Sequence, residues 1–541
     1  MFVEARTLGL LGPEILLIAI ATLIYVGGTF VRQRETWSLV ALITYVAAGI
    51  WLLSTTSGSE VVNSGPISSN GMSLCLRLLA LVLGITFTLA ASQQADRLLA
   101  TEYLGTLMLI VVGLMLVAGA NELVLMFLGF ELISVPTYVL LYLGRRDRAT
   151  GEATMKYFFL SILSSALLLF GLAFLFGMAG TTTITGTHAI PGIREVLQLV
   201  SAGDPGNPQK ALLPLAPVAL VLILAGLGFK LTVAPFHFYA PDVYQGTTNL
   251  NAGLLAVAPK IAGVVGLVRL VIIALPISAD FAWQLALVLA VITMTLGNVC
   301  ALWQRNVRRL MAYSSIAHGG YLLLGLAAAA GSSALPQLNA DGGVTAIIFY
   351  VVVYSLASMG TFTALAYLST PRRELQTVDE LAGLGRTQPL AAAVLAVCMF
   401  SLAGLPPLAG FWGKFSLFTS ALQLALSESG NISLGFVLLL IVGALNAAVA
   451  AAYYLRIVSV MFFQPATSEA PQHSGCYGSL AAAVFCGALV VLSGIAPGPI
   501  LRLAGESEEQ LIGSLKKPTA TAVAVRPAAA PGEILATKVA K

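Results

Sequence analysis

The sequence is poor in charged residues and has no paired cysteine motifs. Only 10% of its 541 residues are charged, against about 25% in soluble domains. Its five cysteines are scattered and include no C-x-x-C, so neither a metal site nor a disulfide framework is indicated. A P-loop and a G-x-G-x-x-G fingerprint are also missing, which excludes the usual nucleotide-binding motifs. The net charge of +4 comes from arginines spread over short loops, a pattern that predicts no nucleic-acid partner.

Long apolar blocks fill the chain instead. Hydrophobic residues make up 58% of it and the mean hydropathy is +0.91. The blocks are roughly 20 residues long, enough to cross a hydrocarbon core of about 30 Å. The predicted spans are 13–30, 37–55, 73–93, 103–120, 122–143, 157–179, 212–235, 252–275, 282–303, 308–329, 344–368, 389–426, 434–463 and 479–502. The sequence therefore predicts an all-α polytopic membrane protein with about 14 transmembrane helices. The first block has no basic segment before it, so we interpret it as a span and not as a cleaved signal.

Two of the predicted spans carry helix-breaking residues. The seventh contains Pro235 and is expected to continue beyond it to about residue 249, and the twelfth is interrupted by GLPPLAG (404–410). Proline removes a backbone donor and clashes with the preceding turn. Broken backbone at membrane depth is tolerated where it is buried in protein or lines a watery cavity. Paired discontinuous helices are typical of transporters built from inverted repeats, although a packing kink would also explain either break alone.

The loop charges predict an orientation. Connections 1–2, 3–4, 5–6, 9–10 and 11–12 hold Arg32, Arg34, Arg97, Arg145, Arg146, Arg148, Lys156, Arg305, Arg308, Arg309, Arg372, Arg373 and Arg386. The even-numbered connections hold only Arg77, Arg194 and Lys210. By the positive-inside rule, the odd-numbered connections face the cytoplasm or an equivalent compartment. Both termini are then expected on the opposite side.

Lysine and arginine are distributed differently. Nearly all arginines lie in loops or at span ends, with Arg269 the main exception, whereas four lysines lie in or against spans: Lys156, Lys230, Lys260 and Lys414. A buried lysine can lose its proton, but an arginine stays charged. Lys156 borders a loop, so snorkelling to the interface explains it well. Lys230 lies roughly 22 Å along its helix at 1.5 Å per residue, too deep for that.

A buried carboxylate and a weak repeat accompany the lysines. Glu131 lies about nine residues inside a span, where it must be neutral, hydrogen-bonded to a neighbouring helix or paired with a cation. Glu131 and Lys230 are 99 residues apart, and His318 and Lys414 are 96 apart. Spans four to eight would then match spans nine to thirteen, and because five is odd, the second unit would be inverted.

Three long motifs resemble one known family. GFKLTVAPFHFYAPDVYQG (228–246), GNVCALWQRNVRRLMAYSSIAHGGY (297–321) and LAGLPPLAGFWGKF (402–415) are similar in order and spacing to the antiporter-like membrane subunits of respiratory complex I, the NADH:quinone oxidoreductase. PDVYQG and Lys414 resemble the N-type, or subunit 2. The resemblance implies fourteen helices with two inverted five-helix repeats and broken helices 7 and 12. The expected parts are residues 1–120 for helices 1–4, 121–275 for the rest of the first repeat, 276–463 for the second repeat, 464–503 for a last transmembrane helix and 504–541 for a disordered tail.

The resemblance also implies roles for single residues. Glu131 matches a glutamate that pairs with the lysine of the seventh span, here Lys230. Lys260 matches a connecting lysine and Lys414 a terminal one, and His237 and His318 fall on the polar axis between two half-channels. The chain departs from the family at Tyr239–Ala240 and at Thr247–Leu250, which leaves the start of helix eight open.

The implied activity is proton translocation coupled to quinone reduction elsewhere in a larger complex. The resemblance implies no cofactor in this chain, and NAD, FMN, iron–sulfur clusters and quinone in partner subunits. The expected partners are the M-, K-, J- and L-type membrane subunits and lipids, in the plasma membrane or an organelle inner membrane, with both termini on the outer side. Three alternatives stay open: a subunit of a multisubunit cation/proton antiporter, a purely structural membrane subunit, and a photosynthetic or F420-linked relative of complex I.

Overall fold

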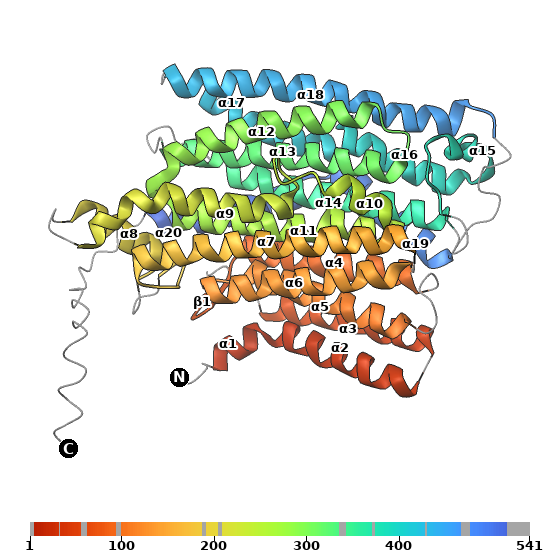
Figure 1. The fold of residues 1–541 in the computed structure, drawn as a ribbon, viewed down its shortest axis with the longest axis horizontal. Helices are drawn as coiled ribbons and strands as arrows, with labels where there is room; N and C mark the ends of the chain where they lie inside the picture. Colours follow the sequence, from red (N-terminus) through yellow and green to blue (C-terminus); the bar gives the residue numbers. More distant parts are fainter. Residues whose placement is uncertain are drawn as a thin grey trace.

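The computed structural model describes most of the chain. The described residues are 5–31, 33–55, 62–92, 99–145, 147–186, 191–203, 208–334, 342–369, 374–427, 430–466 and 476–516. They form long helices that lie side by side, with α2 and α3 along one edge of the molecule and α18 along the opposite edge (Figure 1). Only one small hairpin, β1–β2, interrupts this all-α architecture in the described part of the chain.

The helices and strands up to the first break have these bounds: α1 (Ala5–Leu10), α2 (Gly12–Phe30), α3 (Arg34–Thr55), β1 (Val62–Ser64), β2 (Ile67–Ser69), α4 (Gly71–Ala91), α5 (Ala100–Gly119), α6 (Leu123–Gly144), α7 (Arg148–Ala179), α8 (Ile193–Ala202), the 3₁₀ segment η1 (Pro208–Leu215) and α9 (Ala216–Leu231). Those after it are α10 (Ala240–Gly246), α11 (Asn249–Gly266), the π-helical η2 (Leu267–Ala274), η3 (Pro276–Ser278), α12 (Ala279–Leu302), α13 (Val307–Ala334), α14 (Gly343–Tyr367), η5 (Asp379–Leu381), α15 (Leu384–Thr387), α16 (Pro389–Ala403), α17 (Ala409–Ala425), α18 (Gly430–Phe463), α19 (Tyr477–Ile495) and α20 (Gly498–Lys516).

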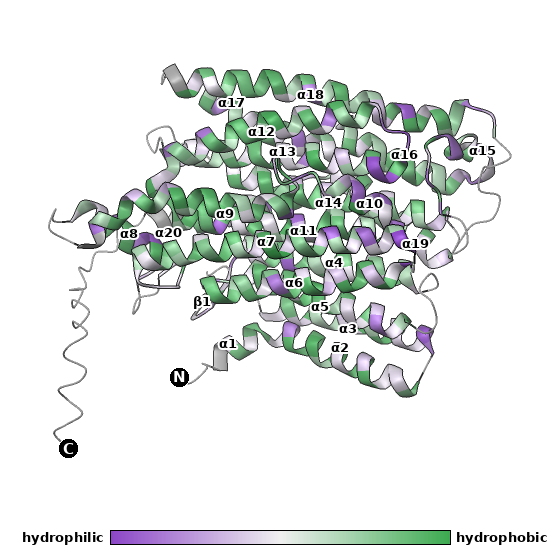
Figure 2. Ribbon diagram, viewed as in Figure 1, coloured by the Kyte–Doolittle hydropathy of each residue, from purple (hydrophilic) through white to green (hydrophobic). Residues whose placement is uncertain are grey.

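The predicted fold class is confirmed. Thirteen helices of the described chain are long and apolar enough to cross a membrane. The remaining predicted span is the pair α16 and α17, which are 15 and 17 residues long and too short to be counted singly. Figure 2 shows the long helices mainly in the colour of hydrophobic residues, as expected for surfaces that face lipid. The core lies in the middle of the bundle, where α11 is buried along its whole length.

Two ends of the bundle can be distinguished. We call the end with the β1–β2 hairpin, α8 and α20 the hairpin end; it lies at the left of Figure 1. We call the end with α10 and α15 the pocket end, because a polar pocket opens there; it lies at the right of Figure 1. The predicted odd-numbered connections fall at the pocket end. Helix α1, the first described helix, lies at the hairpin end.

Both predicted helix breaks are present. Helix α9 ends at Leu231, and Thr232 has a left-handed φ of 58° before the chain continues into α10. Helix α16 ends at Ala403, the capping residue Gly404 has a φ of 89°, and α17 begins at Ala409. Positive φ costs little for glycine but is uncommon for a β-branched residue. The Thr232 conformation therefore points to a specific role for this turn, whose hydroxyl binds Lys260.

The start of helix eight follows from the residues that depart from the family motif. The Thr248 side chain accepts a hydrogen bond from the backbone N–H of Asn251, so it caps α11, which begins at Asn249. The expected disordered tail was wrong in its first part, because α20 runs from Gly498 to Lys516 after α19 has ended. The carboxylate of Glu508 accepts hydrogen bonds from the Gly342 and Thr345 backbone N–H groups at the start of α14. Residues 517–541 lie outside the described chain.

Candidate functional site

Lys230 is buried near the end of α9, and its side chain is 3% exposed. Its ammonium Nζ donates to Ser134 Oγ of α6 at 2.9 Å and lies 5.2 Å from the centre of the Phe130 ring. Both contacts come from one face of α6, because residues three and four apart share a helix face. The sequence did not single out Ser134, since an isolated serine in an apolar helix carries no signal.

Glu131 belongs to the same helix but does not pair with Lys230. Its carboxylate accepts a hydrogen bond from Ser165 Oγ of α7, and no ion pair joins it to a described cation within 4.0 Å. Glu131 is partly exposed, whereas Ser134 faces inward. The two groups form no direct ion pair in this conformation, and the pairing that the resemblance implies stays a prediction. The carboxylate lies on the flank of the lysine and within reach of the molecular surface.

Lys260 of α11 lies fully buried against the first helix break. Its Nζ donates to Leu231 O at 3.2 Å, to Thr232 Oγ1 at 2.9 Å and to Ser315 O of α13 at 2.7 Å. The left-handed turn at Thr232 brings its hydroxyl and the preceding carbonyl to this ammonium. The carbonyl end of a helix carries partial negative charge and stabilises a cation. The first break therefore provides the cation-binding groups for Lys260.

His318 of α13 lies in the middle of a cluster of tyrosines. Its Nδ1 is 2.6 Å from Tyr350 Oη and its Nε2 is 3.0 Å from Tyr454 Oη. Three residues earlier, Ser315 Oγ lies 3.0 Å from Tyr354 Oη, within hydrogen-bonding distance, and the Ser315 backbone oxygen accepts from Lys260. Ser315 and His318 thus form a row of polar side chains along one face of α13, with Lys260 bound at the Ser315 end, but no hydrogen bond joins Ser315 or Tyr354 to His318 in the described chain.

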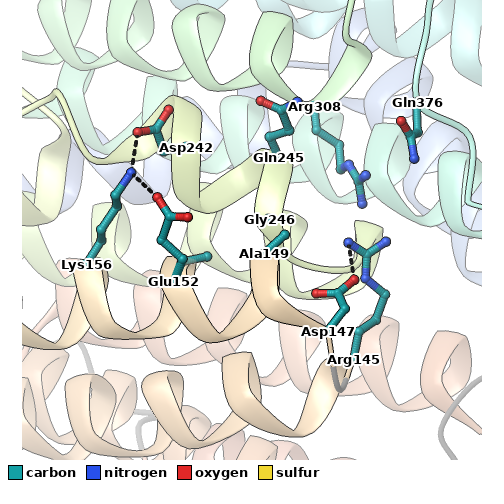
Figure 3. A pocket seen from close by; sticks show the side chains of 11 residues that line it. Arg145, Asp147, Ala149, Glu152, Lys156, Asp242, Gln245, Gly246, Arg308 and Gln376 are labelled. Carbon is teal, nitrogen blue, oxygen red and sulfur yellow. Dashed lines mark hydrogen bonds and ion pairs between the residues drawn. The ribbon is translucent and has the colours of Figure 1, made fainter.

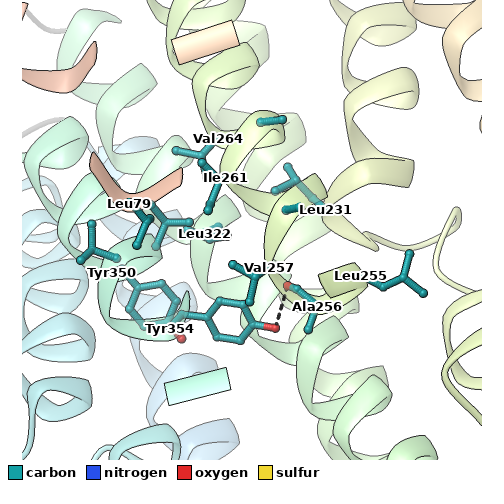
Figure 4. Packing of buried hydrophobic residues seen from close by; sticks show 14 of the residues in the cluster. Leu79, Leu231, Leu255, Ala256, Val257, Ile261, Val264, Leu322, Tyr350 and Tyr354 are labelled. Carbon is teal, nitrogen blue, oxygen red and sulfur yellow. Dashed lines mark hydrogen bonds between the residues drawn. The ribbon is translucent and has the colours of Figure 1, made fainter. Parts of the chain in front are cut away.

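The tyrosines of this row were missed by sequence reasoning. Tyr350 and Tyr354 are four residues apart on α14, so they share a helix face, but this spacing is also common in ordinary apolar cores. Figure 4 shows Tyr354 among aliphatic side chains that include Val257 and Ile261, with its hydroxyl donating to Ala256 O at 3.2 Å. Only the tertiary packing of α11, α13 and α14 places these hydroxyls in one row.

Lys414 of α17 repeats the arrangement at the second break. Its Nζ donates to Leu402 O at 3.0 Å and to Ala403 O at 2.8 Å, which are the last carbonyls of α16. It also lies 5.2 Å from the Tyr321 ring centre. A cavity of about 10 Å³ lies beside it and is lined by Lys414, His318, Tyr350 and Ser401 among others. That volume corresponds to about one water position, although most of the lining surface is apolar.

His237 lies in the irregular segment between α9 and α10 and is half-buried. Its Nδ1 atom is buried without a hydrogen-bond partner. No hydrogen bond joins its ring to Lys230 or Lys260 in the described chain. Of the six predicted site residues, the structure places Lys260 and His318 along one face of α13 and Lys414 across a cavity from His318. Lys230 binds Ser134 of α6, and within the described residues Glu131 and His237 have no hydrogen bond to any of these four residues.

A polar pocket of about 480 Å³ opens at the pocket end of the bundle. Figure 3 shows Lys156 pointing toward Asp242 and Glu152, with Nζ–O distances of 2.8 Å to both. Lys156 is 41% exposed, in agreement with its placement at a span border. Asp242 of α10 also pairs with Arg309 of α13 at 2.8 Å. The pocket therefore joins the first repeat to the second through charged groups.

A second ion cluster lies on the other wall of this pocket. Glu374 pairs with Arg145 at 2.9 Å and with the buried Arg308, whose Nη1 also donates to Thr247 O. Nearby, burial acts to raise the pKa of the Asp147 carboxyl, but hydrogen bonds from Thr150 and the charges of Arg145 and Arg308 hold it below its usual value. Among the described residues no group of three or more His, Cys, Asp or Glu side chains could hold a metal ion.

Known proteins are similar to this chain in sequence and in architecture. The family described as NADH:quinone oxidoreductase/Mrp antiporter, transmembrane region, matches residues 120–441. This range is more than half of the chain. The chain belongs to this family. The predicted recognition is thereby confirmed, and the matched range contains all six residues that the resemblance singled out.

Individual members of the NADH:quinone oxidoreductase/Mrp antiporter family resemble the chain over most of its length. NADH-quinone oxidoreductase subunit N 1 of Rhizobium meliloti is 36% identical over 86% of this chain and 90% of the relative. F(420)H(2) dehydrogenase subunit N of Methanosarcina mazei is 34% identical over 93% of this chain and 98% of the relative. A chain of respiratory complex I from Thermus thermophilus is 30% identical, with a TM-score of 0.71 over 91% of this chain and all of that one.

Proposed function

We propose that the chain is the N-type, proton-translocating membrane subunit of an NADH:quinone oxidoreductase, and that it moves protons along Lys230, Lys260, His318 and Lys414. The chain would be one subunit of a proton-translocating enzyme complex and would carry out no redox step itself. NAD, FMN, iron–sulfur clusters and quinone would belong to partner subunits, since this chain supplies no motif for them.

The observation that carries the proposal is the burial of three lysines without carboxylate partners. Lys230, Lys260 and Lys414 are 3%, 0% and 5% exposed, and none forms an ion pair in the described chain. A structural lysine at such depth would be expected to pair with an anion. Lysines held only by hydroxyls and helix-end carbonyls can instead bind and release protons.

The geometry supports a relay with two kinds of step. Tyr354 lies between Lys260 and His318, with its ring centre 5.6 Å from Lys260 Nζ and 4.8 Å from the His318 ring centre. The Ser315 and Tyr354 hydroxyls can donate and accept, and a neutral His318 accepts at one ring nitrogen and donates at the other, so these groups would pass a proton from Lys260 toward the cavity beside Lys414. Between His318 and Lys414, the small cavity has room for about one water. From Lys414 the proton would leave toward the hairpin end, because α17 runs that way after the break.

Glu131 supplies the control of Lys230. When its carboxylate lies near the ammonium it favours the charged form, and when it is drawn away the lysine releases its proton more easily. In the structure Glu131 is bonded to Ser165 and is partly exposed. That position supports a role in which a neighbouring subunit attracts the carboxylate and so triggers proton movement.

The assembly follows from the same proposal. We expect M-, K-, J- or L-type membrane subunits and lipids against the exposed apolar helix faces, no nucleic acid, and a plasma membrane or organelle inner membrane location. The basic loops put the pocket end in the cytoplasm and both termini on the outer side. The similarity to an F(420)H(2) dehydrogenase subunit keeps a different electron donor open, and a cation/proton antiporter subunit is the alternative within the family.

Lys414→Arg tests the proposal. Arginine keeps a positive charge beside the α16 carbonyls but cannot release its proton at working pH. We expect the variant to assemble and to lose at least about tenfold in NADH-driven proton uptake into inverted vesicles, normalised to assembled complex.

Lys210→Arg is the matched control. Lys210 also donates to a backbone carbonyl, Gly203 O at 2.9 Å, but it lies in a connection between spans, so pumping should stay at the wild-type level. Full pumping by Lys414→Arg would mean that position 414 needs only a fixed charge, and the relay would have to be abandoned. If Lys414→Arg does not assemble, Lys414→Met at matched volume provides the same comparison.

A further inference from the structure

Two arginines lie inside the repeats and take no part in the row of lysines. Arg269 of η2 is 1% exposed, and its Nη2 donates to Ala118 O at 2.7 Å. Arg456 of α18 is half-buried, and its Nη1 donates to Leu302 O at 2.9 Å while its Nη2 donates to Gln304 O at 2.6 Å. Each guanidinium thus binds the carbonyl end of another helix, α5 for Arg269 and α12 for Arg456.

These two contacts are equivalent under the internal repeat. Helices α5 and α12 are the first helices of the two repeats, and α11–η2 and α18 are the last. The arginine follows its acceptor by 151 residues in the first repeat and by 154 in the second. Because the repeats are inverted, Arg269 lies toward the hairpin end and Arg456 toward the pocket end. Each repeat therefore closes one end with the same arginine–carbonyl contact.

The closed ends lie away from the polar pocket and from the small cavity beside Lys414. In the first repeat, the 480 Å³ pocket lies at the pocket end against α7 and α10, away from Arg269. In the second repeat, Lys414 and its cavity lie beyond the break of span twelve, on the side away from Arg456. An arginine therefore stands where a proton crossing one repeat alone would have to leave.

Neither arginine has its charge cancelled by a carboxylate. No ion pair within 4.0 Å involves Arg269 or Arg456 in the described chain, and the Nε atom of each is buried without a partner. Arginine stays charged at any working pH. The helix-end carbonyls hold the guanidinium in place and balance only part of its charge. Fixed positive charge of this kind excludes protons and cations from membrane pores.

We propose that Arg269 and Arg456 are a symmetry-related pair of electrostatic plugs, each of which prevents a proton from crossing the membrane through one repeat without passing along the central row. This inference rests on the proposed proton path. It gives the two arginines a role in preventing passive proton leakage and no role in proton transfer.

The test measures passive proton permeability of the assembled complex in sealed vesicles, without NADH, from the decay of an imposed pH difference. Arg269→Gln and Arg456→Gln remove the charge and keep an amide donor. We expect each to raise the decay rate about tenfold. Arg305→Gln, which removes an exposed arginine in connection 9–10, should leave the rate unchanged.

Second-site variants distinguish a specific leak from a disturbed protein–lipid boundary. The Arg269→Gln leak should be abolished by Lys230→Ala and not by Lys414→Ala, and the Arg456→Gln leak should show the reverse pattern. The proposal that the two arginines block proton leakage would be overturned by unchanged permeability in both glutamine variants, or by leaks that no lysine variant affects. Arg456 is half-buried, so its variant keeps the test decisive if Arg269→Gln does not assemble. Because the leak needs no NADH, a failure of the pumping variants would be recognised separately.

Discussion

At the scale of single residues, the site depends on which group faces each buried ammonium. Lys260 and Lys414 both donate to the last carbonyls of a broken helix. These partners are neutral, and their partial charge stabilises a cation by only about 0.3–1 kcal/mol at exposed sites and up to ~2 kcal/mol when partly buried. A carboxylate would hold the proton far more tightly. The carbonyl partners therefore suit a lysine that must both take up and give up a proton.

Tyr350→Phe tests the relay at this scale. The substitution removes the hydroxyl 2.6 Å from His318 Nδ1 and leaves the ring packing in place. Loss of one hydrogen bond, about 1 kcal/mol, corresponds to a roughly fivefold slower transfer step. We expect NADH-driven proton uptake to fall by about that factor at an unchanged amount of assembled complex.

Tyr367→Phe is the control for this prediction. Tyr367 lies on the same helix, α14, but its hydroxyl donates to Gln388 Oε1 away from the row. Equal pumping by both phenylalanine variants would remove Tyr350 from the path and leave His318 with a packing role.

At the scale of elements, the broken helices are the parts that the sequence predicted best. Pro235 and the GLPPLAG motif marked both breaks, because proline and glycine act through local backbone geometry that any sequence displays. The partners of the lysines could not be predicted in this way. Ser134, Tyr350 and Tyr454 look like ordinary residues of apolar helices, and their function arises only when several helices pack.

Gly410→Ala tests the geometry of the second break. A Cβ at position 410 would overlap the backbone oxygen of Ser401, so α16 and α17 would have to separate. Forced overpacking costs about 1–3 kcal/mol. We expect a lower thermal unfolding midpoint of the purified complex and less assembled protein.

Gly177→Ala provides the comparison, since a Cβ on this helical glycine of α7 would meet nothing within 4 Å. An unaltered midpoint in Gly410→Ala, measured by thermal denaturation beside Gly177→Ala, would show that the two half-helices separate freely.

At the scale of the whole molecule, charged contacts at the pocket end tie the two repeats together. Glu374 lies between Arg145, at the end of the first repeat's helix α6, and the buried Arg308 of α13. Asp242 makes the same kind of bridge between Lys156 and Arg309. The number of spans was predictable because it depends on composition, but these bridges join residues that lie 66 to 229 positions apart. Sequence spacing carries no information about such contacts.

Glu374→Gln tests the bridge between the repeats. It leaves the buried Arg308 without its carboxylate, which costs about 1–3 kcal/mol here because Arg145 and Glu374 are partly exposed. We expect a lower thermal midpoint, with Glu35→Gln, an exposed carboxylate in the first turn of α3, behaving as wild type. Equal midpoints in the two variants would mean that the bridge contributes nothing to stability.

The depth of the three lysines also sets how the protein meets the membrane voltage. Lys230 lies about 21 Å along α9 and Lys260 about 17 Å along α11, at 1.5 Å per residue, so both stand near the middle of the bilayer. Moving one elementary charge across 100 mV requires about 2.3 kcal/mol. A proton that stops at this depth crosses the membrane voltage in two steps, and each step requires roughly 1.2 kcal/mol of electrical work. Each step is slowed about sevenfold, where a single crossing would be slowed about fiftyfold.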